Sequence, residues 1–238
     1  MERRDRVKRT KRLLYASSAL LIAAELSLSI LLQITSGKAV VLFSYLSVVL
    51  ACLFCALFCE RSAAYVTTQA ALLCTVCADW FLVVTEPRRQ LPAMLFFSVA
   101  QLLYAVRLLH AQSHLARRVH LMIRASLSFL SVLATLLVLG KNCDAVAIVS
   151  LFYYVNLVLN ILYAFLAGRR ERIFAVGLVL FLLCDTVIGL SCLDAYLAIP
   201  ADALLWRIIH PGFNLAWVFY VPSQALISLS LLPRALEK

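Results

Sequence analysis

Charged residues are scarce in this chain. Asp, Glu, Lys and Arg together make up 14% of the 238 residues, whereas 64% of the residues are hydrophobic. Soluble domains contain roughly 45 to 50% apolar residues, so this composition excludes a soluble globular domain. The mean hydropathy of +0.95 agrees with that exclusion. The chain is therefore predicted to be an integral membrane protein.

The sequence also lacks the common motifs of hydrolases, nucleotide-binding proteins and metal sites. It contains no nucleophile elbow, no P-loop and no HExxH. Two CxxC spacings are present, Cys52 with Cys55 and Cys74 with Cys77, but apolar residues flank both pairs. Zinc needs four converging ligands in a polar pocket. We therefore predict no metal and no cofactor, and we interpret these cysteines as small packing residues between helices.

Long apolar runs fill almost the whole chain. A helix that crosses a bilayer needs about 20 apolar residues. Eight runs are long enough, and they cover residues 13–33, 39–59, 65–85, 91–110, 120–139, 145–167, 173–194 and 208–231. We predict an all-α membrane protein with eight transmembrane helices in a single domain at 13–232. A basic N-terminus at 1–12 precedes that domain, and a short tail at 233–238 follows it.

The breaks between the runs contain residues that end helices. Gly37, Gly140 and Gly168 lie in short connections. Pro211 and Pro222 lie beside and within the last run, so a kinked or broken helix is expected there.

Lys and Arg are distributed unevenly over the predicted connections. All but five of the 22 lie at the N-terminus, near the connections that follow even-numbered spans, or at the C-terminus. The exceptions are Lys38, Arg88, Arg89, Lys141 and Arg207. Because cytoplasmic loops are enriched in Lys and Arg, we predict that both termini are cytoplasmic.

The net charge of +10 fits this topology, together with attraction to anionic membrane lipid. The N-terminal basic residues abut a span and no aromatic-basic module occurs elsewhere, so no nucleic-acid partner is expected. Very short loops favour a bacterial plasma membrane as the location. The sequence does not determine the oligomeric state.

Asp79 and Asp185 each lie within an apolar run that can cross the bilayer. A carboxylate at that depth costs about 2.5 to 3.5 kcal/mol on insertion scales, so such residues are usually retained for function. The alternative is a protonated Asp that makes a hydrogen bond between helices. Both residues fall in the outer half of outward-running helices. We expect the third and seventh spans to be neighbours, with both carboxyls in one pocket. Glu25 adds a third carboxyl in the same half.

Several polar residues recur at helical spacing and so share one face of their helix. These stripes are Thr68, Thr75 and Asp79; Gln101 and Tyr104; Tyr153, Asn156 and Asn160; and Trp217, Tyr220, Gln224 and Ser228. Any one stripe is explained by hydrogen bonds between helices. Several stripes beside the two acids predict a polar pocket for a ligand with a charged head and an apolar tail.

From the second run onward the chain carries a series of ordered motif residues: Lys38 at the start of the second run, Asp79, the segment 96–104, Tyr153, Cys184 with Asp185, and Tyr220 with Gln224. In these residues the chain resembles the lysoplasmalogenase-like (YhhN-type) membrane proteins. The family consists of eight-span hydrolases that cleave the vinyl ether bond of lysoplasmalogens. The chain departs from the family pattern at Ala78, where the family has Gly, and at Gln101, where it has His.

The resemblance implies a lysophospholipid substrate and a catalytic pair. Vinyl ether hydrolysis needs one acid and one anion, which Asp79 and Asp185 would supply in roles that stay unassigned. The expected substrate-binding residues are Lys38, Gln101, Tyr104, Tyr153, Asn156, Asn160, Tyr220 and Gln224. Two alternatives remain open. One is a transporter or binding protein for a small amphiphile, with Glu25 in a proton relay. The other is a catalytically inactive lipid-binding member, which Gln101 favours.

Overall fold

The computed structural model describes residues 2–110, 112–191, 206 and 213–232, and it describes the side chains from residue 11 onward. Over this part of the chain the fold is helical and contains no strand. The long helices are α1 (Glu2–Ile34), α2 (Lys38–Phe58), α3 (Ala63–Asp79), α4 (Gln90–His110), α5 (His114–Leu139), α6 (Ala145–Leu166), α7 (Arg172–Ser191) and α9 (Leu215–Leu229). Short helical segments follow three of them: η1 (Trp80–Val84), η2 (Gly140–Asn142) and η3 (Gly168–Glu171).

Seven helical stretches of the described residues are long and apolar enough to cross a membrane. The predicted all-helical membrane fold is therefore confirmed. The remaining apolar helix, α9, has 15 residues and contains Pro222. At 1.5 Å per residue it extends roughly 22 Å, less than the ~30 Å thickness of a bilayer core. Residues 208–212, where the eighth span was predicted to start, lie outside the described residues.

Helix boundaries follow local signals in the sequence. The Ser62 and Ser113 side chains accept hydrogen bonds from backbone N–H groups at the starts of α3 and α5, at 3.1 and 3.4 Å. Asp144 does the same for α6 at 2.7 Å. Gly37 and Gly140 adopt φ values of 64° and 51° at the turns before α2 and after α5. Glycine adopts such positive φ values without steric cost.

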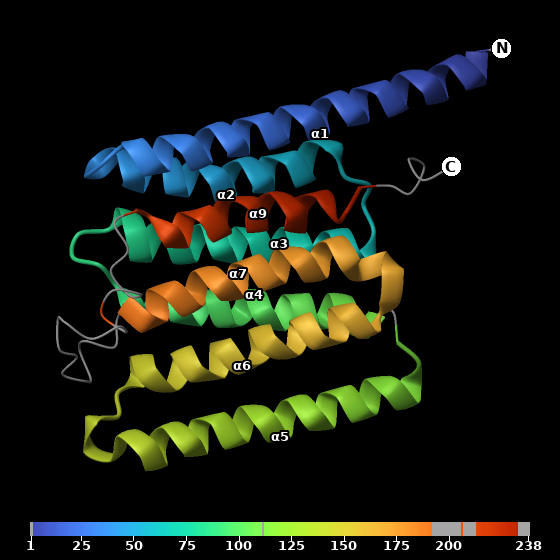
Figure 1. Cartoon of the computed structure of the whole chain (residues 1–238). Helices are drawn as coiled ribbons and strands as arrows, with labels where there is room; N and C mark the ends of the chain where they lie inside the picture. Colours follow the sequence, from blue (N-terminus) through green and yellow to red (C-terminus); the bar gives the residue numbers. More distant parts are fainter. Residues whose placement is uncertain (1, 111, 192–205, 207–212, 233–238) are drawn as a thin grey trace.

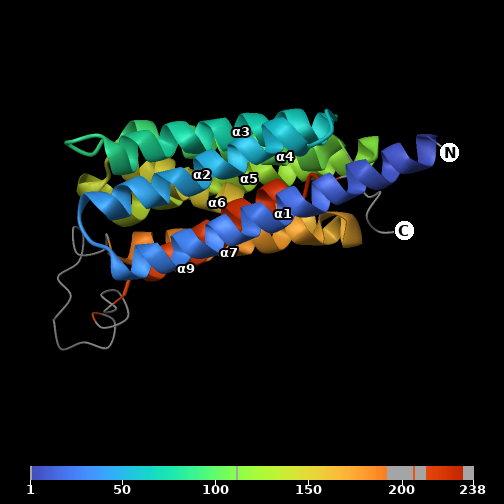
Figure 2. The same ribbon diagram turned by 90° about the horizontal axis from the view of Figure 1, so that it is seen from above.

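Six of the helices form a closed ring. α2 packs on α3, α3 on α4, α4 on α6, α6 on α7, α7 on α9, and α9 on α2. Figure 1 shows these helices side by side, and Figure 2 shows α3 and α7 on opposite sides of the bundle. Buried side chains fill the inside of the ring, among them Phe97, Tyr104, Phe174, Phe181 and Tyr220.

The other two long helices pack on the outside of the ring (Figure 1). α1 packs on α2 and α9. Near its end, Gln33 donates a hydrogen bond to the backbone oxygen of Asn214 at 3.2 Å and accepts one from the Asn214 N–H at 3.0 Å. Among the long helices, α5 packs chiefly on α6, at the opposite edge of the bundle. Much of the α5 surface is therefore left facing lipid.

The ring corrects one expectation about helix neighbours. α3 and α7 were predicted to pack side by side, but α9 and α2 separate them in one direction around the ring and α4 and α6 in the other. The two helices face each other across the ring instead. A residue on α3 and a residue on α7 can therefore approach each other only if both side chains point into the ring.

Candidate functional site

Both intramembrane aspartates are paired with a tyrosine from another helix. The Tyr220 hydroxyl, on α9, donates a short hydrogen bond to Oδ2 of Asp79 at the end of α3. The Tyr153 hydroxyl, on α6, donates a short hydrogen bond to Oδ2 of Asp185 on α7. Asp79 is buried and Asp185 is half-buried. The sequence predicted all four residues as site residues, and the structure pairs them two by two.

Aromatic rings join the two Tyr–Asp pairs through the inside of the ring of helices. The Phe97 ring lies 5.7 Å from Tyr153 and 5.9 Å from Phe181, measured between ring centroids. Phe181 in turn lies 5.8 Å from Tyr220. The two pairs therefore belong to one site, shared by α3, α4, α6, α7 and α9.

The backbone changes geometry directly after Asp79. α3 ends at this residue and continues as the five-residue π-helix η1. Such segments are rare and occur frequently at functional sites. Trp80, the first residue of η1, is 48% exposed. Its ring lies 6.0 Å from that of Tyr45 on α2, in an edge-to-face arrangement. An aromatic pair between α2 and η1 thus lies directly after Asp79 in the chain.

A buried ion pair closes the opposite end of the ring. Arg107 of α4 donates to Glu171 of η3 at 2.7 Å, to Thr68 of α3 at 3.0 Å and to Ser230, just after α9, at 2.9 Å. Its guanidinium also lies 3.9 Å from the centre of the Phe174 ring. One side chain of α4 therefore connects α3, η3 and the residue that follows α9 at this end of the ring.

Three predicted binding residues on α4 and α9 carry polar atoms without partners. Gln101, Tyr104 and Gln224 are fully buried. The Gln101 Nε2, the Tyr104 hydroxyl and the Gln224 Oε1 have no hydrogen-bond partner among the described residues. Buried polar groups are usually satisfied by protein, ordered water or ligand. These atoms are therefore available to water or to a bound molecule inside the ring.

Asn156 and Asn160 lie in a different environment from the aspartates. Their side-chain oxygens each accept a 2.7 Å hydrogen bond from Arg124 of α5. The Asn160 amide also donates to the Gln101 backbone oxygen at 2.8 Å and to its Oε1 at 3.0 Å. The structure therefore places both asparagines between α4, α5 and α6, where they hold an arginine.

The sequence-based interpretation missed Arg124, because it counted this residue among the charges that flank a connection. The spacing does contain a signal. The buried polar residues of α5 are His120, Arg124, Ser128, Ser131 and Thr135, which recur every three or four residues. Such a stripe predicts a polar face towards a neighbouring helix.

Two further candidates lie apart from the Tyr–Asp pairs. Lys38 is exposed in the first turn of α2. Glu25 of α1 is buried against α2, where its Oε2 accepts a 2.7 Å hydrogen bond from Ser47. Its Oε1 has no hydrogen-bond partner among the described residues.

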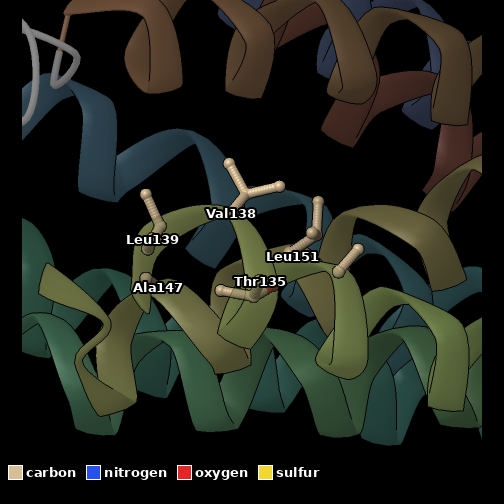
Figure 3. Close-up of a pocket in the computed structure, with 6 residues that line it drawn as sticks. Thr135, Val138, Leu139, Ala147 and Leu151 are labelled. Carbon is tan, nitrogen blue, oxygen red and sulfur yellow. The ribbon is translucent and has the colours of Figure 1, made fainter. Parts of the chain in front are cut away.

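No metal centre emerges from the part of the chain that the structure describes. Within it, no group of three or more His, Cys, Asp or Glu side chains could hold a metal ion. A hollow of about 270 Å³ lies between the ends of α5 and α6 (Figure 3). Its lining is Ala134, Thr135, Val138, Leu139, Ala147 and Leu151, which includes none of the predicted site residues.

Comparison with known proteins gives one result. No curated protein and no solved structure shows a significant match. The sequence profile of the YhhN family, however, matches residues 39–231, which include all six ring helices and both Tyr–Asp pairs. The match covers most of the chain, and it begins one residue after Lys38, the first residue of the motif resemblance. The chain therefore belongs to the YhhN family.

Proposed function

We propose that this protein hydrolyses the vinyl ether bond of lysoplasmalogen-type lysophospholipids, with Asp79 and Asp185 as the catalytic pair. The observation that carries the proposal is the pair of intramembrane carboxyls inside one ring of helices, each held by a tyrosine hydroxyl. Membership of the YhhN family supports the reaction class. No cofactor is required for this chemistry.

The reaction divides naturally between two carboxyl groups. One, as an acid, protonates the outer alkene carbon and so generates an oxocarbenium ion at the carbon bonded to oxygen. The other, as an anion, stabilises this cation and takes a proton from the attacking water. The hemiacetal then collapses to a fatty aldehyde and a glycerophospho-alcohol, so one water is consumed. Two carboxyls in a low-dielectric site favour one ionised and one neutral group, because like charges repel.

The surrounding residues suit an amphiphilic substrate. Arg107 and its partners occupy one end of the ring, so we propose that the lipid enters from the other half of the membrane. Lys38, exposed at the start of α2, is the proposed contact for the lipid phosphate. The unpartnered polar atoms of Gln101, Tyr104 and Gln224 are proposed to hold the attacking water and the substrate oxygen. Asn160 contributes to substrate binding indirectly, because its side-chain amide donates a hydrogen bond to Gln101. Asn156 shares the hydrogen bonds of Arg124 with Asn160.

The decisive test removes one carboxylic acid at a time. Asp79→Asn and Asp185→Asn keep the shape of the side chain but can neither donate an acidic proton nor carry a charge. We expect each to lower aldehyde release from lysoplasmalogen by at least ~100-fold, the lower range for losing an acid or base. Glu60→Gln makes the same chemical change at an exposed position in the α2–α3 connection and should keep full activity.

Purified protein in defined lipid also separates the alternatives. Full aldehyde release by either Asn variant would rule out the catalytic assignment. If the unaltered protein releases no aldehyde but takes up a lysophospholipid or moves protons in proteoliposomes, the transporter alternative is correct. Binding without reaction or transport would identify an inactive lipid-binding member, in which Gln101→His is the first substitution to test for restored activity.

A further inference from the structure

Arg124 is a buried cation outside the candidate active site. Its side chain is 6% exposed and lies between α5 and α6. One terminal nitrogen donates to Asn156 at 2.7 Å, and the other donates to Asn160 at 2.7 Å and lies 3.1 Å from Nε2 of His120. Every one of these partners is a neutral acceptor or an imidazole. Arg124 therefore has hydrogen bonds but no counter-charge among the described residues.

The missing counter-charge distinguishes Arg124 from the other buried arginine. Arg107 faces the Glu171 carboxylate at 2.7 Å, whereas no carboxylate of the described residues bonds to Arg124. The Nε of Arg124 is buried and has no hydrogen-bond partner. An uncompensated charge within a membrane is costly, and such residues usually face a partner, a cavity or a ligand. A guanidinium with a free N–H group and no counter-charge suits an anion.

A second guanidinium lies on the same face of α5. Arg117 precedes His120 by three residues and Arg124 by seven, which is one helical face. Arg117 is half-buried, and its Nε is also without a partner among the described residues. Side chains on a helix lean towards its N-terminus, as the contact of Arg124 with His120 shows. Arg124 therefore points towards Arg117 and the His114 end of α5.

The level of this cluster matches lipid phosphates. α5 has 26 residues, more than the ~20 that span the hydrocarbon core, so its first residues reach the headgroup region. Arg124 lies ten residues after His114, and its leaning side chain returns towards the headgroups. Because α5 packs chiefly on α6 among the long helices, lipid can approach its flank. Arginine binds phosphate oxygens through its planar fork of N–H groups.

We propose that Arg124 and Arg117 bind the phosphate group of an anionic membrane lipid in the leaflet at the His114 end of α5. This site is separate from the Tyr–Asp pairs and does not depend on the proposed activity. The bound phosphate supplies the missing counter-charge between α5 and α6. It also connects the lipid to the ring interior through Asn160 and Gln101.

The test measures phosphatidylglycerol binding to the purified full-length chain by native mass spectrometry. We expect Arg124→Gln to bind this lipid roughly tenfold more weakly or worse, because a hydrogen bond to a charged group is typically worth a factor of ten or more. Arg118→Gln is the matched control: it removes a charge from an exposed position one residue from Arg117 and should bind as the unaltered protein does. Diacylglycerol, which lacks the phosphate, should bind far more weakly than phosphatidylglycerol.

A second variant and a free-ion control keep the test decisive. If Arg124→Gln does not fold, Arg117→Gln should still weaken phosphatidylglycerol binding, because its Nε bonds to no described residue. Equal affinity in Arg117→Gln, Arg118→Gln and the unaltered protein would overturn the site. Inorganic phosphate should compete with the lipid only weakly. Binding of inorganic phosphate as tight as that of the lipid would assign the site to a soluble anion and overturn the lipid.

Discussion

Each catalytic candidate depends on one hydroxyl group. A carboxyl group within a membrane has no water to bind it, so its position depends on the donors that the protein supplies. Tyr220 and Tyr153 each donate to one oxygen of their aspartate, and the other oxygen has no hydrogen-bond partner among the described residues. The tyrosines therefore act as positioning residues in the proposed reaction.

Replacing these tyrosines by Phe tests that role. Tyr153→Phe and Tyr220→Phe remove the donor while the ring contacts with Phe97 and Phe181 remain. We expect kcat for aldehyde release to fall roughly tenfold or more, with little change in KM, because a misplaced catalytic group affects the reaction more than substrate binding. Steady-state kinetics in detergent or nanodiscs would measure both constants.

An adjacent residue provides the control. Tyr154 makes the same kind of contact between the same two helices, a 2.9 Å hydrogen bond between its hydroxyl and that of Thr186, but it does not bond to a carboxyl. Tyr154→Phe should therefore lose stability to a similar degree and retain kcat. Equal kinetic effects of Tyr153→Phe and Tyr154→Phe would indicate that the tyrosines only stabilise the packing of α6 on α7.

For single residues, the sequence predicted the two buried carboxyl groups but not the side chains that bond to them. Asp79 and Asp185 could be found because a carboxyl is costly within an apolar run. Their pairing with Tyr220 and Tyr153 could not, because spacing along one helix does not specify which side chain of another helix approaches it. Asn156 and Asn160 shared a face with Tyr153, and this suggested one pocket. The preceding helix, α5, however, supplies Arg124 to both asparagines.

The packing of α7 on α9 positions two of the site residues, Asp185 and Tyr220. It depends on a glycine. A Cβ atom at Gly177 would lie 3.0 Å from Cγ1 of Ile227, 3.1 Å from the Ile227 nitrogen and 3.2 Å from Cβ of Leu226. Small residues let membrane helices approach closely, and here the backbone of α9 is one of the neighbours.

Gly177→Ala should consequently push α7 away from α9. Overpacking typically costs about 1 to 3 kcal/mol, so we expect the Tm in detergent to fall by several degrees and activity to fall with it. Gly189→Ala is the control on the same helix, because its Cβ would meet nothing within 4 Å. It should leave the Tm unchanged or raise it slightly, since alanine favours helix. A Gly177→Ala variant as stable as Gly189→Ala would contradict this account of the α7–α9 contact.

Local signals predicted where helices lie, but not how they are ordered around the ring. α2, α4 and α6 begin within one residue of the predicted spans, since glycine, proline and capping residues mark those ends. α5 begins six residues early, at His114, because the Ser113 cap lies well before the apolar run starts. The order of helices around the ring results from tertiary packing between distant segments. Similar depth alone therefore led to the wrong neighbour for α3.

At the scale of the whole molecule, the first and the last described helix share one end of the bundle. α1 begins and α9 ends at the same end of the helices in Figure 1. The connection that contains Glu60 lies at this end, and the connection that contains Arg88 lies at the other. The ion pair between Arg107 and Glu171 lies towards the first end, and the Tyr–Asp pairs lie towards the second. The orientation in the membrane therefore also determines which leaflet supplies the substrate.

The distribution of Lys and Arg predicts that the end with Glu60 is cytoplasmic. Single cysteines can test this prediction in intact cells with a membrane-impermeant maleimide, in a background in which all eight native cysteines are replaced by Ser. Arg88→Cys should react without permeabilisation, and Glu60→Cys should react only after it, because both positions are exposed but lie at opposite ends of the bundle. The reverse pattern would invert the topology: the Tyr–Asp site would then open to the cytoplasmic leaflet, and the proposed phosphate site would face the outer one. If both positions are labelled in intact, sealed cells, they lie on the same side of the membrane, and α3 does not cross it.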